Sequence, residues 1–488
     1  MDAETPAELR RPDLSQADIR SIFYGLMLAM FLSALEATIV ATALPTIGRE
    51  LGDAEHLPWV VTAYLLAATA VTPLYGKFAD MHGRRVTLLS AIAIFILGSI
   101  GCALAPSLPL LAAARAVQGL GGGGLIAIAQ TIIGDLVTPR ERGRYQGYLG
   151  TVFASASVLG PVLGGFLSES FHWTWIFWLN LPLGLLTFLL VNNRLKLLPR
   201  HDRRHRLDIL GAGLMIGATS TLMLALSWGG IAYGWASAPV LGLFAASALL
   251  WLGFGFRLGT AREPLIPVAV LADRVVALGT AAGALTMGTY VGLTVLVPLF
   301  FEGALGLSAR ESGLALIPMM VGVPLGATLS GRLMASVVHY KRVPLAGCTV
   351  AILAISGLAY LAGRGPLWSV EILLGIAAFG LGTIFPVTTV AVQNAVAPQH
   401  LGTATASMNF LRQLSAAVVV AIFGAVAFGG MAVDLHGAAA PRQISADSFR
   451  MVLAIAATAF AAALAALALM EERPFRDRPG LAPKRPLD

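Results

Sequence analysis

The sequence predicts an all-α polytopic membrane protein, with about fourteen transmembrane helices arranged as two six-helix halves plus two inserted helices. Composition is the first reason, because 57% of the 488 residues are hydrophobic and only 12% are charged, whereas soluble domains hold about 25% charged residues. Apolar runs long enough to span a bilayer, about 20 residues, recur along the chain. Lys and Arg cluster in alternate connections between these runs, and segments of the first part recur in the last part. Most of the chain is therefore expected to be surrounded by lipid.

The apolar runs give the order of the spans along the chain. The N-terminal stretch MDAETPAELRRPDLSQADIR is polar, and the apolar run after it is too long for the core of a signal peptide, so we predict a retained first span. The predicted spans are 21–43, 57–75, 87–105, 109–133, 145–168, 173–193, 208–229, 238–256, 275–300, 311–333, 343–362, 367–391, 404–428 and 448–470.

The basic residues predict the orientation of these spans. The connections LAPSLP, between spans 3 and 4, and GGIAYGWASAP, between spans 7 and 8, contain neither Lys nor Arg. Since cytoplasmic connections carry an excess of Lys and Arg, we expect both termini in the cytoplasm, an even number of spans, and a location in the cytoplasmic (inner) membrane. The basic residues that carry this pattern are Arg10, Arg11, Arg20, Lys77, Arg84, Arg85, Arg140, Arg142, Arg144, Arg194, Lys196, Arg200, Arg203, Arg204, Arg206, Lys341, Arg342, Arg473, Arg476, Lys484 and Arg485.

Composition and motifs argue against several other classes of protein. The formal net charge of +7 is compatible with nucleic-acid binding, but the basic residues lie in short connections between spans, so we predict no nucleic-acid partner. Cys102 and Cys348 lie in apolar runs, and the histidines form no H-E-x-x-H pattern. We therefore predict neither a disulfide framework nor a metal site.

The stretch RAVQGLGGGG contains Gly119, Gly121 and Gly124 at the G-x-G-x-x-G spacing of dinucleotide-binding loops. Such a loop follows a strand and has an acidic residue about 20 positions further on. Here the glycines lie within a predicted helix and Asp135 comes too early, so no cofactor is predicted. Glycines in a membrane helix let neighbouring backbones approach closely, which is the role we expect, and an additional hinge role stays open.

The two ends of the chain contain similar segments in the same order. LAAARAVQGLGGG in span 4 is similar to ILLGIAAFGLGTI in span 12, and each is followed by a proline and a glycine four residues apart, Pro139 and Gly143, then Pro398 and Gly402. GKFADMHGRR after span 2 corresponds to GRLMASVVHYKR after span 10. We therefore predict that spans 1–6 and 9–14 are parallel copies, an architecture of transporters whose substrate site lies between the repeats.

This repeat divides the chain into predicted segments. They are a cytoplasmic N-terminal segment (1–20), the first six-helix half (21–194), a cytoplasmic loop with two inserted helices (195–257), a second cytoplasmic loop (258–274), the second six-helix half (275–470) and a cytoplasmic C-terminal tail (471–488).

Three ionisable residues lie deep within predicted spans, where a charge is costly and needs a partner or an aqueous cavity. Arg115 lies in span 4 with Gln118 one turn further on, and Arg412 lies about two turns into span 13. Glu36 lies within span 1, and since burial favours the neutral form of an acid, it is a candidate proton carrier. The alternative is that Glu36 is a static partner of Arg115. For Arg412, a functional role and extension of the side chain to the cytoplasm both stay open.

Two further segments combine residues of special chemistry. GKFADMHGRRVTLL is expected to be a short loop, in which Asp80 lies among Lys77, Arg84 and Arg85 and can make charge-assisted bonds across the cytoplasmic ends of helices. LGPVLGG in span 5 combines a proline, which kinks a helix, with glycines that admit a close neighbour. The residues of this second segment are Gly160, Pro161, Gly164 and Gly165.

These segments resemble the motifs of the major facilitator superfamily. GKFADMHGRR is similar to its motif A, LAAARAVQGLGGG to its motif B, and LGPVLGG to its motif C, which marks antiporters. LEATIVATALP in span 1, HWTWIFWLNLPLG in span 6 and QNAVAPQHLGTATASMNFLRQL in the second half resemble the fourteen-span drug:proton antiporters of the EmrB/QacA type. Asn394 and Arg412 lie in the last of these segments and are the candidate functional residues of the second half.

The resemblance implies a role for each motif. Arg115 is implied to couple to protonation, with Glu36 and Gln118 grouped beside it, and Gly160 to Gly165 are implied to form the interface between the halves. Glu36 stands where the family usually has aspartate, and the second copy of motif A has Ala335 in place of its acid, so any lock is expected to be one-sided. The residues implied to lock the outward-facing state are Gly76, Asp80, Gly83, Arg84 and Arg85.

The predicted function is proton-driven export of lipophilic drugs or toxic compounds across the cytoplasmic membrane by alternating access. Export of an endogenous metabolite or lipid by the same machinery stays open as an alternative. A membrane-embedded enzyme or sensor would need a nucleophile, a metal cluster or a soluble catalytic domain, so no enzyme activity is predicted. The predicted partners are a lipophilic small molecule, protons and the bilayer, and the sequence leaves open whether a periplasmic adaptor protein docks.

Overall fold

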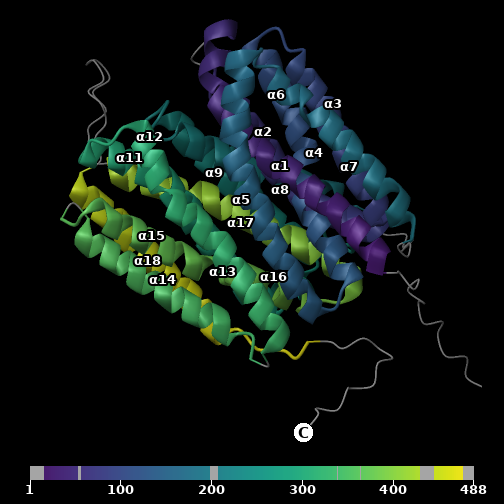
Figure 1. Cartoon of the computed structure of the whole chain (residues 1–488). Coiled ribbons are helices and arrows are strands. Elements are labelled where there is room, and N and C mark those ends of the chain that lie inside the picture. Colours follow the sequence, from purple (N-terminus) through teal and green to yellow (C-terminus); the bar gives the residue numbers. More distant parts are fainter. Residues whose placement is uncertain are drawn as a thin grey trace, which may run out of the picture.

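The computed structural model describes residues 16–52, 56–197, 207–337, 339–362, 364–428 and 445–475. Within these ranges, 14 helices are long and apolar enough to cross a membrane, which confirms the predicted number of spans. The two halves lie as two lobes, the first drawn in purple to blue and the second in green to yellow (Figure 1). The predicted N-terminal segment up to residue 15, residues 198–206 of the connection after the sixth span, and the tail from residue 476 lie outside the described residues.

The first half contains six spans. They are α1 (Gln16–Leu51), α2 (Trp59–His82), α3 (Arg84–Ala103), α4 (Leu108–Leu136), α5 (Pro139–Ser170), and a last span formed by α6 (Trp175–Trp178) and α7 (Asn180–Arg194), followed by the 3-10 turn η1 (Leu195–Leu197). The insertion contains α8 (Ile209–Trp228), α9 (Ala238–Thr260) and the short helix α10 (Val268–Ala272).

The second half repeats this series of helices. It contains α11 (Arg274–Leu305), a span formed by α12 (Ala309–Ala315) and α13 (Ile317–Ser336), α14 (Arg342–Leu361), a span formed by α15 (Leu367–Gly382) and α16 (Ile384–Ala395), the 3-10 turn η2 (Pro398–His400), α17 (Leu401–Phe428) and α18 (Ala446–Leu469).

The packing of the helices follows the predicted repeat. α1 packs on α5 as α11 packs on α17, and α4 lies between α2 and α3 as α15 lies between α13 and α14. Across the two halves, α5 packs on α13 and α2 packs on α17. Each half therefore uses its second and fifth spans to contact the other half.

Motif A is helical, which corrects the expectation of a loop. α2 continues to His82 and α3 begins at Arg84, so that only Gly83 separates the two helices. Gly83 has a φ of 87°, a left-handed conformation that glycine adopts without the steric cost of a Cβ. The helices extend beyond their apolar runs, so hydropathy alone places their ends too early.

Three spans are interrupted, although their apolar runs are continuous. The breaks lie at Leu179 between α6 and α7, at Leu316 between α12 and α13, and at Thr383 between α15 and α16. At two of them the backbone changes to i→i+3 hydrogen bonds, from Leu316 N to the Gly313 carbonyl (3.3 Å) and from Thr383 N to the Gly380 carbonyl (3.2 Å). Such tighter turns change the direction of the second segment of a span while its backbone groups stay hydrogen-bonded.

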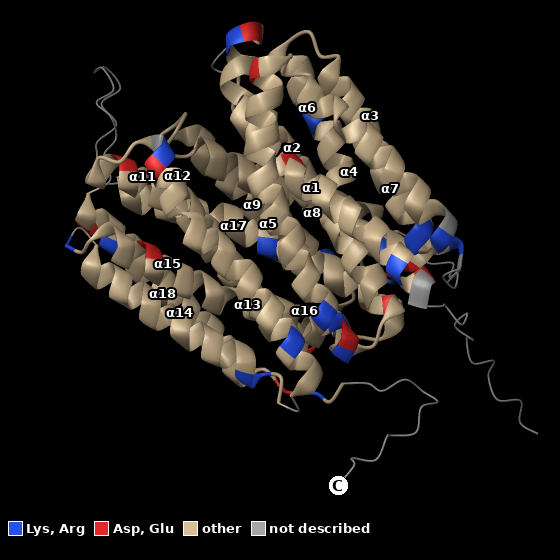
Figure 2. Cartoon of the chain, viewed as in Figure 1, with Lys and Arg blue, Asp and Glu red and all other residues tan. Residues whose placement is uncertain are grey.

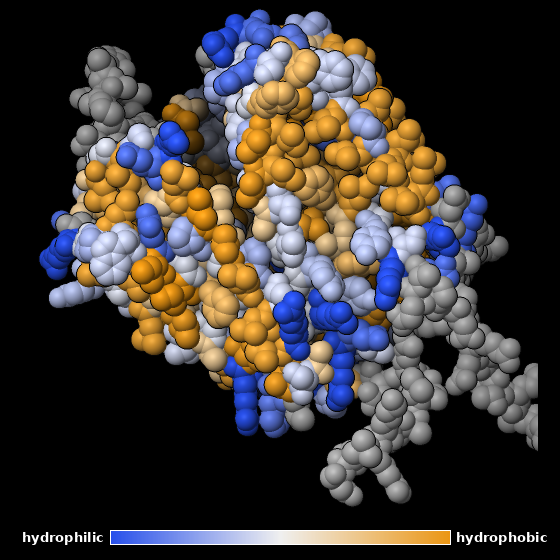
Figure 3. All heavy atoms as spheres, viewed as in Figure 1, coloured by the Kyte–Doolittle hydropathy of each residue, from blue (hydrophilic) through white to orange (hydrophobic). Residues whose placement is uncertain are grey.

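The charged residues gather at the two ends of the bundle, with few along its length (Figure 2). We call the end with the α2–α3, α4–α5 and α13–α14 connections the basic end, and the other end, which holds the α3–α4 connection, the opposite end. Apolar side chains cover the flank of the molecule between these ends (Figure 3). This surface fits a bilayer, where lipid chains contact the flank and charged groups remain in water.

The inserted helices contact both halves. α8 packs on α2 of the first half and on α17 of the second. Two aromatic contacts support this position: Trp228 of α8 lies 6.2 Å from Trp59 of α2, and Trp251 of α9 lies 6.2 Å from Phe410 of α17, measured between ring centroids. The insertion therefore covers the seam between α2 and α17.

Candidate functional site

Glu36 of α1 and Arg115 of α4 form an ion pair inside the first half. Their side chains are 0% and 1% exposed, and Arg115 Nη1 donates a hydrogen bond directly to Glu36 Oε1. The structure therefore brings together the two deep charges that the sequence indicated in this half. Removing either partner alone would leave a buried, uncompensated charge, which is strongly destabilising.

The Arg115 guanidinium makes further contacts. Nη1 donates to Gln118 Oε1 at 2.6 Å, and Nε donates to the Val60 carbonyl of α2 at 2.8 Å. The guanidinium carbon lies 4.4 Å from the ring centroid of Tyr64 and 5.8 Å from that of Phe177, within the range of cation–π attraction. Arg115 is thus held from several sides, and the predicted partner Gln118 belongs to its network.

Asn180 completes this network, and sequence reasoning missed it. Its Nδ2 donates to Glu36 Oε2 at 2.6 Å and to Ser99 Oγ at 2.9 Å. Ser99 Oγ also accepts a hydrogen bond from Gln118 Nε2 at 3.2 Å. We call the five side chains the coupling network: they are Glu36, Ser99, Arg115, Gln118 and Asn180. The signal that could have revealed Asn180 is an amide inside the apolar stretch HWTWIFWLNLPLG.

The aromatic residues around Asn180 are partly buried. A run of tryptophans at this point suggests a belt at the membrane interface, but Trp173 is only 2% exposed and belongs to a core with Ile176 and Phe177. Trp175 is 52% exposed. The run therefore packs the start of the sixth span onto the first half, which helps to hold Asn180, the first residue of α7, beside Glu36.

The glycine block positions Arg115 by allowing α4 to lie very close to its neighbours. The Cα of Gly119 faces the backbone carbonyl of Tyr64 in α2, and the Cα of Gly121 faces the backbone of Phe95 in α3, both too closely for a Cβ. These contacts lie within the helix α4, so the glycines do not form a nucleotide-binding loop. Close packing of this kind holds a membrane helix where hydrophobic association cannot.

Asp80 joins the two halves at the basic end. Its Oδ1 accepts a hydrogen bond from Gly402 N at 3.0 Å, and its Oδ2 accepts one from Thr403 N at 2.8 Å and one from Thr403 Oγ1 at 2.7 Å. Gly402 and Thr403 lie in the first turn of α17, where backbone N–H groups have no partner within the helix. A carboxylate of the first half therefore caps a helix of the second half.

Arg84 strengthens the same junction. Its guanidinium pairs with Asp80 (Nη1 to Oδ1, 2.8 Å) and with Asp135 at the end of α4 (Nε to Oδ2, 2.8 Å). Its Nη2 donates to the carbonyl of Pro398, just before α17, at 3.4 Å. A Cβ at Gly76 would lie 2.5 Å from the Gly402 carbonyl oxygen, so the helices meet through glycines here. We call the Asp80, Arg84 and Asp135 cluster, with its bonds to α17, the lock cluster.

Arg85 lies apart from the lock cluster. It donates to the carbonyl of Asn192 at 3.1 Å and to its Oδ1 at 2.6 Å, and both residues belong to the first half. Arg85, which the sequence grouped with Asp80, therefore links α3 to α7 within the first half. Lys77 donates to the carbonyl of Pro264, beyond the inserted helices, at 3.4 Å.

The second junction between the halves, α5 with α13, contains no acid in the position of Asp80. Gly143 and Gly331 lie in direct backbone contact, and Thr328 Oγ1 donates to the Gly147 carbonyl at 3.3 Å. Ala335, at the position where the acid of motif A would stand, is exposed. In this conformation the charged contacts of motif A are thus found at the α2–α17 junction, and α5 meets α13 through glycines.

Motif C packs within the first half in this conformation, in contrast to the implied interface between halves. Gly160 lies against Thr38 of α1, and Gly164 lies against Thr42 of α1. Pro161 is exposed, and nothing lies within 4 Å of a Cβ built at Gly165. The reason is geometric, because α5 contacts α13 through its basic end, whereas motif C lies nearer the opposite end.

The candidates of the second half lie in different places. Arg412 of α17 is buried, and its Nη2 donates to Thr388 Oγ1 of α16 at 2.8 Å. The alternative that Arg412 extends to the surface is therefore wrong. Asn394, near the end of α16, donates from Nδ2 to the carbonyl of Pro474 at 3.1 Å. Asn394 thus lies at the basic end and contacts the segment that follows α18.

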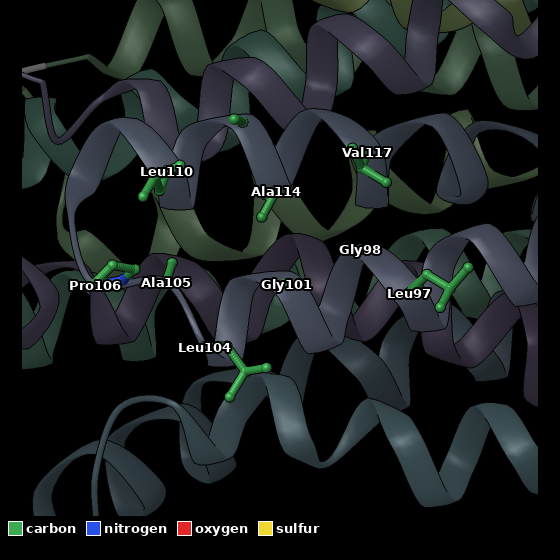
Figure 4. Close-up of a pocket in the computed structure, with 10 residues that line it drawn as sticks. Leu97, Gly98, Gly101, Leu104, Ala105, Pro106, Leu110, Ala114 and Val117 are labelled. Carbon is green, nitrogen blue, oxygen red and sulfur yellow. The ribbon is translucent and has the colours of Figure 1, made fainter.

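An apolar groove of about 420 Å³ lies between α3 and α4 at the opposite end. Leu97 lines it from α3, and Leu110 and Val117 line it from α4, beside the connection with Pro106 (Figure 4). Its lining consists of Leu, Val, Ala, Gly and Pro side chains. The groove is therefore separate from the polar atoms of the coupling network.

Comparison with known proteins places this geometry in a family. Residues 26–420 match the Major Facilitator Superfamily. The chain is 34% identical over 413 residues to "Multidrug resistance protein 3" of Bacillus subtilis, covering 84% of this chain and 80% of that protein. It is 34% identical over 410 residues to "Multidrug transporter protein MdtP" of the same organism, covering 82% and 74%.

Solved structures share the fold. A bacterial homologue of the iron transporter ferroportin in the outward-facing state matches with a TM-score of 0.63 at 13% identity, over 92% of this chain and 98% of that one. The proton:xylose symporter XylE matches with a TM-score of 0.63 at 15% identity, over 94% and 96%. With 14 apolar helices in its described part and a family match over most of its length, the chain belongs to the Major Facilitator Superfamily as a multi-pass membrane transporter.

Proposed function

We propose that this chain is a proton-coupled antiporter that exports lipophilic compounds, including drugs, across the cytoplasmic membrane. The observation that carries the proposal is the fully buried ion pair of Glu36 and Arg115, because an ionisable pair at membrane depth is costly and marks a transport or proton pathway. The names of the relatives, a multidrug resistance protein and a multidrug transporter, support the substrate class.

The basic end is the cytoplasmic end in this proposal, and both termini lie in the cytoplasm. The support is the enrichment of Lys and Arg in connections at that end, as expected for cytoplasmic loops. With this orientation, the lock cluster and the glycine contacts between Gly143 and Gly331 close the cytoplasmic side. The surface is hollowed between the lobes towards the opposite end (Figure 3), so the conformation corresponds to an outward-facing transporter.

Glu36 is the proton carrier in this mechanism. Its carboxylate is stabilised by the Arg115 guanidinium and by Asn180 Nδ2. Protonation removes the negative charge, which weakens both contacts and releases the guanidinium from its partner. Because α1, α3, α4 and α7 each contribute to this network, a change of charge at Glu36 alters how four helices pack. That change in packing is the step that links proton binding to the exchange between outward- and inward-facing states.

The energy of one proton suffices for useful export. Moving one elementary charge across ~150 mV releases ~3.5 kcal/mol, which supports a concentration ratio of a few hundredfold. Export of an endogenous metabolite or lipid would use the same residues and the same energy, so substrate panels distinguish the two. Docking of a periplasmic adaptor would be an addition to this mechanism and is tested by co-purification from membranes.

The test measures uphill export by purified protein in liposomes with an imposed pH gradient. Glu36→Gln keeps the size of the side chain and removes the ionisable group, so we expect gradient-driven export to be lost. Because Arg115 then lacks its counter-charge, export is normalised to the amount of folded protein in the liposomes. Glu302→Gln, at an exposed acid of α11, is the matched control and should transport normally. Full proton-coupled export by Glu36→Gln would show that another group carries the proton.

A further inference from the structure

Three amide side chains form a buried polar cluster between the two halves, and the mechanism proposed above does not use it. Gln130 of α4 belongs to the first half, whereas Gln393 of α16 and Asn409 of α17 belong to the second. Each of these residues is at most 8% exposed. We call the three side chains the amide cluster. Because an amide carries no charge, this cluster differs in chemistry from the lock cluster.

The amide cluster joins the halves by direct hydrogen bonds. Asn409 Nδ2 donates to Gln130 Oε1 at 2.8 Å, and Gln393 Nε2 donates to the backbone carbonyl of Gln130 at 3.2 Å. Within the second half, Gln393 Nε2 also lies 3.2 Å from Thr405 Oγ1. Gly134 of α4 leaves room for this contact, since a Cβ there would lie 3.3 Å from Gln393 Oε1. Separation of the halves at this point must break both bonds to Gln130.

The amide cluster lies deeper between the halves than the lock cluster. Gln130 precedes Asp135 on α4, and Asn409 follows Thr403 on α17. In both helices the offset is between one and two turns, at about 3.6 residues per turn. Charged contacts at the basic end are therefore followed inward by a neutral contact.

Neutral amides suit a contact that opens and closes in every transport cycle. When the halves separate, water replaces the protein partner of each amide, and such an exchange changes the free energy only modestly. Gln393 Oε1 is buried and, in the described part of the chain, has no hydrogen-bond partner. Water that enters on opening can bond this oxygen, which lowers the cost of separating the halves.

The helix α4 connects the amide cluster with the coupling network. Arg115 and Gln118 lie on α4 towards the opposite end, and Gln130 lies on the same uninterrupted helix towards the basic end. A displacement of α4 that follows protonation of Glu36 therefore reaches Gln130 directly.

We propose that Gln130, Gln393 and Asn409 form a second, uncharged gate that closes the substrate path behind the lock cluster. This inference rests on the export by alternating access proposed above. In the closed gate the amides of the two halves bond each other, and in the open gate water bonds them instead. Gln130 is a positioning residue, because it moves with α4 and makes the gate respond to the charge of Glu36.

The first experiment bridges the gate covalently. Gln130→Cys is combined with Asn409→Cys, and a membrane-permeant bis-methanethiosulfonate with a short spacer is added to liposomes during export of a lipophilic dye. We expect the bridge to stop export and a reductant to restore it, which shows that the bridged protein is folded. The control combines Asp18→Cys with Arg194→Cys, whose side chains pair at 2.7 Å within the first half. Bridging this control should leave export unchanged.

Two results of this experiment would overturn the gate. Undiminished export by the bridged Gln130→Cys/Asn409→Cys protein would show that the halves do not separate at the amide cluster. Absence of a bridge, although each single cysteine reacts with the reagent, would show that the two side chains do not meet.

The second experiment uses the chemistry of the amides. Asn409→Leu leaves Gln130 Oε1 without its partner, and a buried polar atom without a partner destabilises the closed state. A cysteine placed at Thr328, part-buried between α13 and α5, should then react about tenfold faster with an impermeant thiol reagent added from the basic end. Asn409→Leu combined with Gln130→Leu replaces both partners by apolar groups, so the rate should return to that of the original chain or fall below it.

These rates distinguish the gate from a packing effect and from the exporter itself. Equal rates in the single and the double variant, or no change in either, would overturn the gate. If the rates follow the expected order but the chain exports no compound of a lipophilic panel, the gate is supported and the proposed function is refuted. If export is normal and the rates do not change, the gate is refuted and the proposed function is kept.

Discussion

The coupling network shows how a few polar side chains are held inside an apolar bundle. Its five members come from α1, α3, α4 and α7, and each bonds at least one other member. A buried polar group without a partner is costly. A substitution at any member of the coupling network is therefore expected to destabilise the others. In the proposed mechanism Glu36 is the proton carrier, and Asn180 is the member that donates a hydrogen bond to its second oxygen.

Asn180→Leu should therefore uncouple proton movement from export. The substitution keeps a similar volume but removes the two hydrogen bonds that Nδ2 donates to Glu36 and Ser99. We expect proton release per exported substrate to fall, and uphill export to drop about tenfold, since a hydrogen bond to a charged group is worth ~1.5–3 kcal/mol. The measurement is substrate-induced proton release from liposomes followed with a pH dye.

Asn192→Leu provides the control on the same helix, because Asn192 bonds Arg85 and lies outside the coupling network. Unchanged proton release in Asn180→Leu would show that this amide only packs the helix. Equal losses in the two variants would indicate a general effect on α7.

The deep charges could be predicted from the sequence because each is a rare ionisable residue in a long apolar run. Asn180 could not, because one amide in a run of tryptophans is equally typical of a membrane interface. Sequence reasoning named Arg115 as a possible partner of Glu36 but left the partners of Arg412 open. The structure pairs Glu36 with Arg115 and leaves Arg412 with threonines, a choice that depends on how the helices pack.

At the scale of elements, the lock cluster joins α2 to α17. Asp80→Asn removes the negative charge that pairs with Arg84 and accepts three hydrogen bonds from α17. Charge-assisted bonds of this kind contribute ~1.5–3 kcal/mol, so the balance between closed and open basic ends should shift by roughly one to two decades. The expected result is a more open basic end.

A cysteine placed at Thr328, part-buried between α13 and α5, reports this opening through its rate of reaction with a membrane-impermeant thiol reagent. The native residues Cys102 and Cys348 are buried and serve as a low background. Asp447→Asn, at an acid that is 88% exposed, should leave the rate unchanged. If the Thr328 cysteine reacts at the same rate with and without Asp80→Asn, the proposed role of Asp80 in closing the basic end is contradicted.

The elements themselves were predictable in number and order but not in their ends and breaks. Hydropathy is continuous across Leu179, Leu316 and Thr383, so it contains no signal for the interruptions there. Motif A was expected to be a loop because it is polar, yet α2 and α3 continue through it up to Gly83. Backbone hydrogen bonding extends a helix beyond the membrane as long as its end finds a partner.

For the whole molecule, orientation is the first testable feature. If both termini are cytoplasmic, reporter fusions after Arg206 and near the C-terminus should both report a cytoplasmic location. A fusion in the α3–α4 connection, at Ser107, should report the outer side. A cytoplasmic reading at Ser107, or opposite readings at the first two positions, would contradict the proposed topology.

The balance of deep charges predicts which cations are exported poorly. The spans, as far as the structure describes them, contain one deep carboxylate, Glu36, and it already pairs with Arg115. A dication at the bilayer centre would need more than one carboxylate to offset its desolvation. We therefore expect neutral and singly charged lipophilic compounds to be exported and rigid dications to be exported poorly.

The measurement pairs a monovalent cationic dye with a bivalent analogue of similar hydrophobicity. Since the cation and the proton would compete for Glu36, export of the monovalent dye should fall as the cytoplasmic pH decreases. Equal or better export of the bivalent dye would mean that another acidic group contributes, or that the central cavity is well hydrated.

The cap that Asp80 provides to α17 has a further consequence for the transport cycle. Gly402 and Thr403 find acceptors for their backbone N–H groups on the other half of the protein. When the halves separate at the basic end, α17 loses this cap and its first turn is free to fray. Each cycle then includes a small local unfolding and refolding step at a helix end. Amide hydrogen exchange at Gly402 and Thr403 should consequently be faster during turnover than when the basic end stays closed. Its rate would report how often the basic end opens.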